Sequence, residues 1–120
     1  MLPKQYRLPL RTEFNRLKKE GKLFQGKLCS LLVSHSREAG PRFARQPSRF
    51  AFIVSNKIHK KATKRNKIRR LLSEAVWQFL PEIKPGSEGV FLVKKSIIGA
   101  NYQQIKQEVK VLLQKAQLTI

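Results

Sequence analysis

Residues 56–70 most constrain the fold of this chain, because they carry eight Lys or Arg and no acidic residue. The segment runs directly into a pattern typical of an amphipathic helix. At 100° per residue, the apolar positions share one stripe that must face a core. These positions are Ile68, Leu71, Leu72, Ala75 and Phe79. The sequence therefore predicts a rigid helix that holds its cations in fixed register.

The other side of this helix favours a polyanion partner over plain solvent. Asn66, Arg70, Ser73 and Trp77 fall opposite the apolar stripe. A solvated face is the ordinary interpretation of a charge run, but such faces usually mix signs so that i,i+4 pairs offset one another. Here the first acidic residue is Glu74. Repulsion among eight like charges opposes folding, and a polyanion relieves that repulsion.

The basic character extends over the whole chain. The 120 residues include 26 Lys plus Arg against seven acidic residues, all Glu, which gives a net charge of +19. A charge excess of this size in a folded domain is an electrostatic footprint for nucleic acid. No long apolar run, signal peptide or lipidation motif is present, so we predict a cytoplasmic protein without membrane association. Cys29 lies in an apolar run, which predicts a buried thiol in a reducing compartment.

The expected elements form one domain over residues 1–120. Their class is α+β: a sandwich with a small mixed sheet flanked by helices. The unit over residues 49–95 is strand, helix, strand, and it contains the basic helix. We expect helices over 12–20, 62–80 and 101–116, strands over 28–34, 49–55 and 90–95, a loop over 34–48 and a turn over 84–89. Thr12 is the expected N-cap of the first helix, Gly21 ends it, and Pro81 ends the second.

The chain offers no evident catalytic or metal site of its own. Metal-dependent nucleases need clustered carboxylates, whereas Asp is absent and the Glu residues are dispersed. A metal-free ribonuclease needs a general acid and base, usually two histidines, but we expect His35 and His59 to be solvated or to contact phosphates. One Cys and two separated His do not make a zinc site. We therefore predict no catalytic residue, no protein-bound metal and no small-molecule cofactor.

RNA is favoured over DNA as the polyanion. No helix-turn-helix pair surrounds the basic helix, and aromatic residues are interleaved with basic ones, as suits stacking on single-stranded bases. Core packing is the simpler interpretation of Phe14, Phe50 and Phe52, whereas we expect Trp77 to be exposed or stacked on a partner. Two other functions stay open on these grounds: a non-catalytic basic protein of the ribosome or nucleoid, and a stand-alone nuclease.

The segment VSNKIHKKATKRNKIRRLLSEAV (54–76) resembles the signature of the bacterial ribonuclease P protein subunit. In that family a strand ending Val-Ser/Ala-Lys-Lys leads into a helix bearing Arg-Asn-Arg-x-Lys-Arg-x-x-Arg-Glu. The segment LPKQYRL (2–8), followed by Phe14 and Gly21, is similar to the family's amino-terminal pattern. VFLVKK (90–95) resembles its late strand. The resemblance covers nearly the whole chain.

The resemblance implies the protein component of a ribonucleoprotein endonuclease that removes the 5′ leader of precursor tRNA. Its partners are the ribonuclease P RNA subunit, which hydrolyses the phosphodiester through bound Mg²⁺, and precursor tRNA. A cleft between the sheet and the flanking helices takes the single-stranded leader, with Phe14 and Lys18 in it. A left-handed strand, helix, strand crossover is also implied, against the usual rule. The residues implied to contact the RNA are Lys57, Lys60, Lys61, Lys64, Arg65, Asn66, Lys67, Arg69 and Arg70.

The sequence departs from the family pattern at four positions. Asn56 replaces the first Lys at the strand end, and Lys67 replaces an Arg, which keeps the charge but loses the bidentate fork. Ser73 removes the last cation of the helix signature. Lys18 replaces a second aromatic residue after Phe14, so we expect leader binding to depend more on charge and less on stacking.

Overall fold

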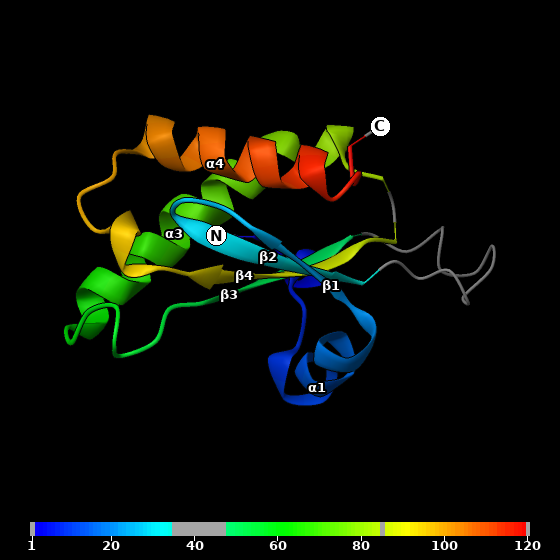
Figure 1. Ribbon diagram of the computed structural model, residues 1–120, viewed down its shortest axis with the longest axis horizontal. Helices are drawn as coiled ribbons and strands as arrows, with labels where there is room; N and C mark the ends of the chain where they lie inside the picture. The colour runs from blue at the N-terminus through cyan, green and yellow to red at the C-terminus, as the bar shows by residue number, and fades with distance from the viewer. Residues whose placement is uncertain (1, 35–47, 85, 120) are drawn as a thin grey trace.

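Four strands form one central sheet in the computed structural model, which describes residues 2–34, 48–84 and 86–119 (Figure 1). The strands are β1 (Lys22–Gln25), β2 (Cys29–Ser34), β3 (Arg49–Ile53) and β4 (Glu88–Val93). Their order across the sheet is β1-β2-β4-β3. β2 pairs antiparallel with β1 and β4, and β3 pairs parallel with β4. The predicted α+β class with a small mixed sheet is confirmed.

The helices cover both faces of this sheet. Figure 1 shows α1 (Leu10–Glu20) on one face, and α3 (Ala62–Phe79) and α4 (Tyr102–Lys115) side by side on the other. The described residues also form three short 3₁₀ helices: η1 (Lys4–Tyr6) before α1, η3 (Leu80–Glu82) directly after α3, and η4 (Lys95–Ile97) between β4 and α4. α3 joins the parallel neighbours β3 and β4, as expected for the strand, helix, strand unit. The left-handed sense of that crossover stays a prediction.

The core is divided between the two faces because neighbouring side chains of a strand point to opposite sides. On the α3 and α4 side, Leu31 and Phe91 are buried together with Leu72 and Leu112. A smaller apolar cluster lies on the α1 side. Its buried members are Leu8, Leu17, Leu32, Ala51 and Val90. Burial on both faces explains why β2 has three consecutive apolar residues, Leu31, Leu32 and Val33, and not an alternating pattern.

The predicted orientation of α3 is confirmed for its apolar stripe and wrong for Ser73. Leu72 and Ala75 are fully buried, and the other predicted stripe residues are partly buried against the main core. Ser73, expected on the exposed side, is only 3% exposed, and Val76 is buried as well. α3 packs against both α4 and β3, and tertiary packing therefore buries more of the helix than one stripe. A buried position suits Ser better than a cation.

The helix ends differ in part from expectation. α1 begins at Leu10, with Pro9 and not Thr12 as its N-cap, because the proline ring presets a φ of −72° there. Gly21 does end α1, and its backbone there is extended. Glycine is needed at this position because a Cβ would lie 2.5 Å from the Leu17 carbonyl oxygen. α4 starts with a capping box in which Asn101 and Gln104 exchange side-chain to backbone hydrogen bonds, both 2.9 Å.

Two strand predictions also need correction. β1 was not expected, because the Lys22–Gln25 segment, exposed except at the half-buried Phe24, has no apolar alternation and is held by pairing with β2. β4 begins at Glu88 and so takes in part of the predicted turn. The amino-terminal segment lies along the edge of β3, where the Leu8 N–H donates to the Phe50 carbonyl at 3.0 Å. The predicted loop 34–48 lies outside the described residues except at its two ends.

Candidate nucleic-acid interface

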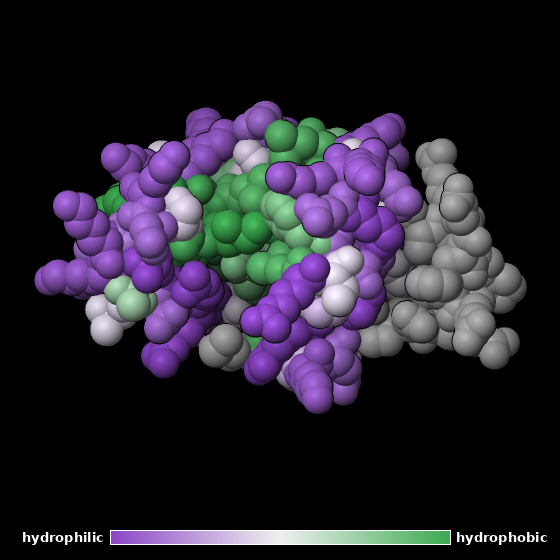
Figure 2. Space-filling model, turned by 90° about the horizontal axis from the view of Figure 1, so that it is seen from below, coloured by the Kyte–Doolittle hydropathy of each residue, from purple (hydrophilic) through white to green (hydrophobic). Residues whose placement is uncertain are grey.

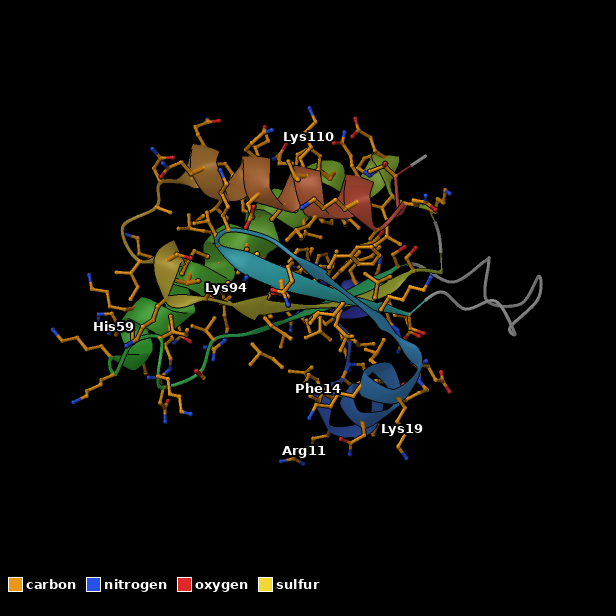
Figure 3. The ribbon with its side chains drawn as sticks, in the orientation of Figure 1. Arg11, Phe14, Lys19, His59, Lys94 and Lys110 are labelled. Carbon is orange, nitrogen blue, oxygen red and sulfur yellow. The ribbon has the colours of Figure 1, made fainter. Side chains whose placement is uncertain are left out.

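The predicted RNA-binding residues gather on the amino-terminal half of α3 and on the segment before it. Figure 3 places His59 at this end of the molecule, well away from Phe14 on α1. Most of these side chains are exposed, and Arg65 and Arg69 are half-buried. The exposed ones are Lys57, Lys60, Lys61, Lys64, Asn66, Lys67 and Arg70. The structure therefore brings all nine predicted side chains to one end of α3.

Arg65 and Arg69 have a second role that sequence reasoning missed. One Nη of Arg65 donates to the carbonyl oxygens of His59 and Lys60, both at 2.9 Å. Arg69 donates to Asn66 Oδ1 at 2.7 Å and to the Val54 carbonyl at 3.4 Å. These bonds brace the segment after β3 against α3. A guanidinium has five N–H donors, so each arginine keeps donors for a phosphate.

The ion pairs of the described residues all lie elsewhere and involve Arg16 or Arg49. Arg16 pairs with Glu88 at 2.6 Å, with Glu13 at 2.7 Å and with Glu20 at 3.6 Å, and Arg49 pairs with the other oxygen of Glu88. Burial lowers the pKa of Arg16, but its hydrogen bonds to Glu88 and Glu13 outweigh that effect and raise the pKa. Arg16 thus stays charged. This network fastens α1 to the start of β3 and β4.

The cations of α3 are consequently uncompensated within the described part of the chain. The first turn of α3 contains no acidic residue, and its N-cap Lys61 makes no side-chain capping bond. The positive end of the helix dipole adds to the side-chain charges, and a helix amino terminus favours phosphate. Repulsion among these charges destabilises the isolated protein, and binding of a polyanion would relieve that repulsion.

The second predicted surface lies on the α1 side of the sheet. Phe14 is half-buried against the smaller apolar cluster, against which Ile53 and Leu92 also pack. The ammonium of Lys18 lies 5.1 Å from the centroid of the Phe14 ring, a cation–π contact. Figure 2 shows an apolar area between hydrophilic regions on this side of the molecule. Figure 3 shows Arg11 and Lys19 pointing away from the sheet.

In the described part of the chain, His59 and Cys29 show no arrangement for catalysis. Nδ1 of His59 accepts a hydrogen bond from the Lys61 N–H at 3.1 Å, and His35 lies outside the described residues. Within the described ranges, no group of three or more His, Cys, Asp or Glu is placed to hold a metal ion. Cys29 is buried as predicted, and burial raises the pKa of its thiol to about 12, so the thiol is protonated at neutral pH. Across the same ranges, no helix is long and apolar enough to cross a bilayer.

The fold and the cationic helix define a class, the small basic α+β proteins that bind polyanions. Comparison with known proteins narrows this class. The family model for Ribonuclease P matches residues 2–117. The chain belongs to the ribonuclease P protein family.

Relatives and solved structures agree with that membership. The ribonuclease P protein component of Microcystis aeruginosa is 34% identical over 117 residues, covering 98% of this chain and 95% of the relative. That of Synechocystis is 34% identical over 115 residues, covering 96% and 88%. The RNase P protein from Thermotoga maritima, solved with 1-(4-fluorophenyl)-2-thiourea, has a TM-score of 0.78 at 26% identity, covering 91% of this chain and 98% of that one. The Staphylococcus aureus RNase P protein has a TM-score of 0.82 at 20% identity, a likeness of fold alone, covering 98% and 100%.

Family membership confirms the resemblance on which the sequence prediction of function depended. The chain is a protein component of ribonuclease P, a ribonucleoprotein endoribonuclease of tRNA 5′ processing. The alternative of a ribosomal or nucleoid protein is not supported.

Proposed function

We propose that this protein binds the RNA subunit of ribonuclease P through α3 and residues 54–61, and that the apolar area beside α1 takes the 5′ leader of precursor tRNA. The observation that supports RNA-subunit binding is that the acidic partners and the cations of α3 lie in different parts of the molecule. The described ion pairs lie around Arg16 and Arg49, whereas the eight cations of residues 57–70 have no ion-pair partner among the described residues. Phosphates supply the missing negative charge.

The residues of this surface divide into two roles. Lys64, Lys67 and Arg70 are exposed on α3 itself and contact phosphates directly, while Lys57, Lys60 and Lys61 reinforce them from the preceding segment. Arg65 and Arg69 hold that segment in place and offer their remaining donors to the RNA. Asn66 presents an exposed amide that can bond a phosphate, a ribose or a base edge.

Hydrolysis itself belongs to the RNA partner. Mg²⁺ prefers several oxygen ligands that include carboxylates, but the carboxylate of Glu88 accepts from Arg16 and Arg49, and that of Glu108 accepts from the backbone N–H groups of Leu28 and Cys29. These carboxylates do not fit a metal site. We therefore assign Mg²⁺ to the RNA subunit and its substrate, and assign to the protein the binding of substrate and the neutralisation of phosphates.

The proposal treats residues 1–120 as one cytoplasmic domain. Its support is that both apolar clusters share the one sheet, β2 and β4 contributing to each. A buried, unpaired cysteine is in keeping with a reducing compartment.

Leader binding is tested with Phe14→Ala and substrates of two leader lengths. If one leader base stacks at Phe14, the variant should bind precursor tRNA with a long leader about 1–3 kcal/mol more weakly. It should bind a substrate trimmed to one or two leader nucleotides as the wild type does. Affinities of the reconstituted holoenzyme, measured by equilibrium binding, give the comparison.

Phe24→Ala is the matched control, since Phe24 is also half-buried but packs on the opposite face of the sheet. It should lose stability without selective loss of long-leader binding. An equal loss for both substrates in the Phe14 variant would exclude the α1 face as the leader site.

A further inference from the structure

Trp77 presents an exposed indole on the same face of α3 as the proposed RNA contacts. Trp77 is the chain's one tryptophan, and it is 44% exposed although it is a large apolar residue. Counted at 100° per residue, Asn66, Arg70 and Trp77 lie within about 40° of one another around the helix. The seven residues from Arg70 to Trp77 span about 10.5 Å along the axis. Beyond the buried Ser73, the side of α3 that carries Asn66 and Arg70 therefore ends in a large aromatic surface.

The ring of Tyr6, near the amino terminus of the chain, packs against this indole. The two ring centroids are 5.9 Å apart at an interplanar angle of 67°, an edge-to-face contact. Tyr6 belongs to η1 and is half-buried against the main core, so it is a fixed neighbour. An open pocket of about 450 Å³ lies beside both rings, lined by Tyr6, Trp77, Gln78, Leu80 and Pro81. Its walls are mainly aromatic and apolar, with the amide of Gln78 as a hydrogen-bonding group.

We propose that Trp77 and Tyr6 form a stacking platform for an unpaired base of the ribonuclease P RNA subunit. The inference rests on the proposed function and extends that interface to the carboxyl half of α3. Stacking on an aromatic ring suits any base, because every base has a π-face, and the exposed Gln78 amide can bond the edge of a splayed base.

Charge and position select this occupant over the other candidates. A second copy of this chain would bring a net charge of +19 to the same surface, which repulsion disfavours. The leader site proposed at Phe14 lies with α1 on the other face of the sheet (Figure 1). A strand bound along Lys67 and Arg70, in contrast, already lies on the side of α3 that presents Trp77 about two turns further on, past the buried Ser73.

Fluorescence offers a direct test because Trp77 is the only tryptophan. Titration of the full chain with the RNA subunit should quench the indole emission and shield it from acrylamide. A fully paired RNA duplex should bind the cations without that quenching. Quenching by precursor tRNA alone and not by the RNA subunit would overturn the assignment. So would self-association of the free protein that is lost on Trp77 substitution.

Affinity measurements separate this proposal from the one it rests on. Trp77→Leu should weaken RNA-subunit binding about 5- to 150-fold, the equivalent of about 1–3 kcal/mol per stacked base. Trp77→Phe should stay within a few-fold of wild type, and circular dichroism checks that both variants fold. If Trp77→Leu binds normally while Arg70→Ala binds weakly, the platform is wrong and the α3 interface stands. If neither variant loses affinity, both proposals fail.

Discussion

Affinity of this protein for the ribonuclease P RNA subunit should fall by about 10³- to 10⁵-fold between 50 and 200 mM salt. This range holds for proteins that neutralise about six to ten phosphates, because each neutralised phosphate releases condensed counterions. The nine residues proposed at the start of α3 include eight cations, none in an ion pair within the described structure. Filter binding at several salt concentrations gives the slope of log K against log salt.

Single variants test which cations produce that slope. Arg70→Ala should flatten it by about one unit, because Arg70 is exposed and contacts phosphate in the proposal. Arg69→Ala should flatten it by about the same amount, and should also loosen the segment that Arg69 braces at Val54. Lys110→Ala is the matched control, since Lys110 is an exposed cation on α4. Equal flattening by the Lys110 and Arg70 variants would show that general charge, and not the face of α3, governs binding.

Leu72→Ala should destabilise the protein by about 2–5 kcal/mol. Leu72 is fully buried between α3 and the rest of the main core, so the substitution loses apolar contact and leaves a cavity. Leu23→Ala removes the same atoms at a residue that is 48% exposed and should cost far less, within about 0.5 kcal/mol. Urea unfolding of the three proteins measures the difference.

Asn66→Ala, on the same helix, should lower RNA affinity and leave stability nearly unchanged. Asn66 is exposed, so the free energy of unfolding should be nearly unchanged although its amide accepts a bond from Arg69. RNA affinity should fall, because the substitution removes the amide and frees the Arg69 guanidinium from its position. Loss of stability in the Asn66 variant, with none in the Leu72 variant, would reverse the assigned faces of α3.

The elements that sequence patterns predicted well are those whose own residues determine them. The cationic helix shows its apolar period and its proline stop within the segment itself, and the buried strands show apolar runs. β1 could not be found in this way, because Lys22–Gln25 has no apolar alternation and becomes a strand only by pairing with β2. Ser73 was misplaced for a similar reason, since its burial depends on tertiary packing that the pattern of the helix alone does not show.

In the candidate site, too, the features set by local sequence could be predicted and those set by tertiary packing could not. Charge and helical phase predicted most of the side chains that reach solvent on α3, but not the burial of Ser73. They could not predict that Arg65 and Arg69 bond backbone carbonyls, because that depends on the path of the segment after β3. Nor could they pair Tyr6 with Trp77 across about seventy residues of sequence, a contact that depends on the packing of Tyr6 against the main core. The leader site at Phe14 stays a prediction, supported by the apolar surface beside it.

The most direct test of the account is cleavage of precursor tRNA by scrupulously RNA-free protein, by the RNA subunit and by both together, over a range of Mg²⁺. The account predicts no cut by the protein alone at any Mg²⁺ concentration, and one cut at the leader junction when both are present. The protein's benefit should be largest at low Mg²⁺, where its cations best replace screening ions. Cleavage by the protein alone, or no benefit to the RNA at low Mg²⁺, would contradict it.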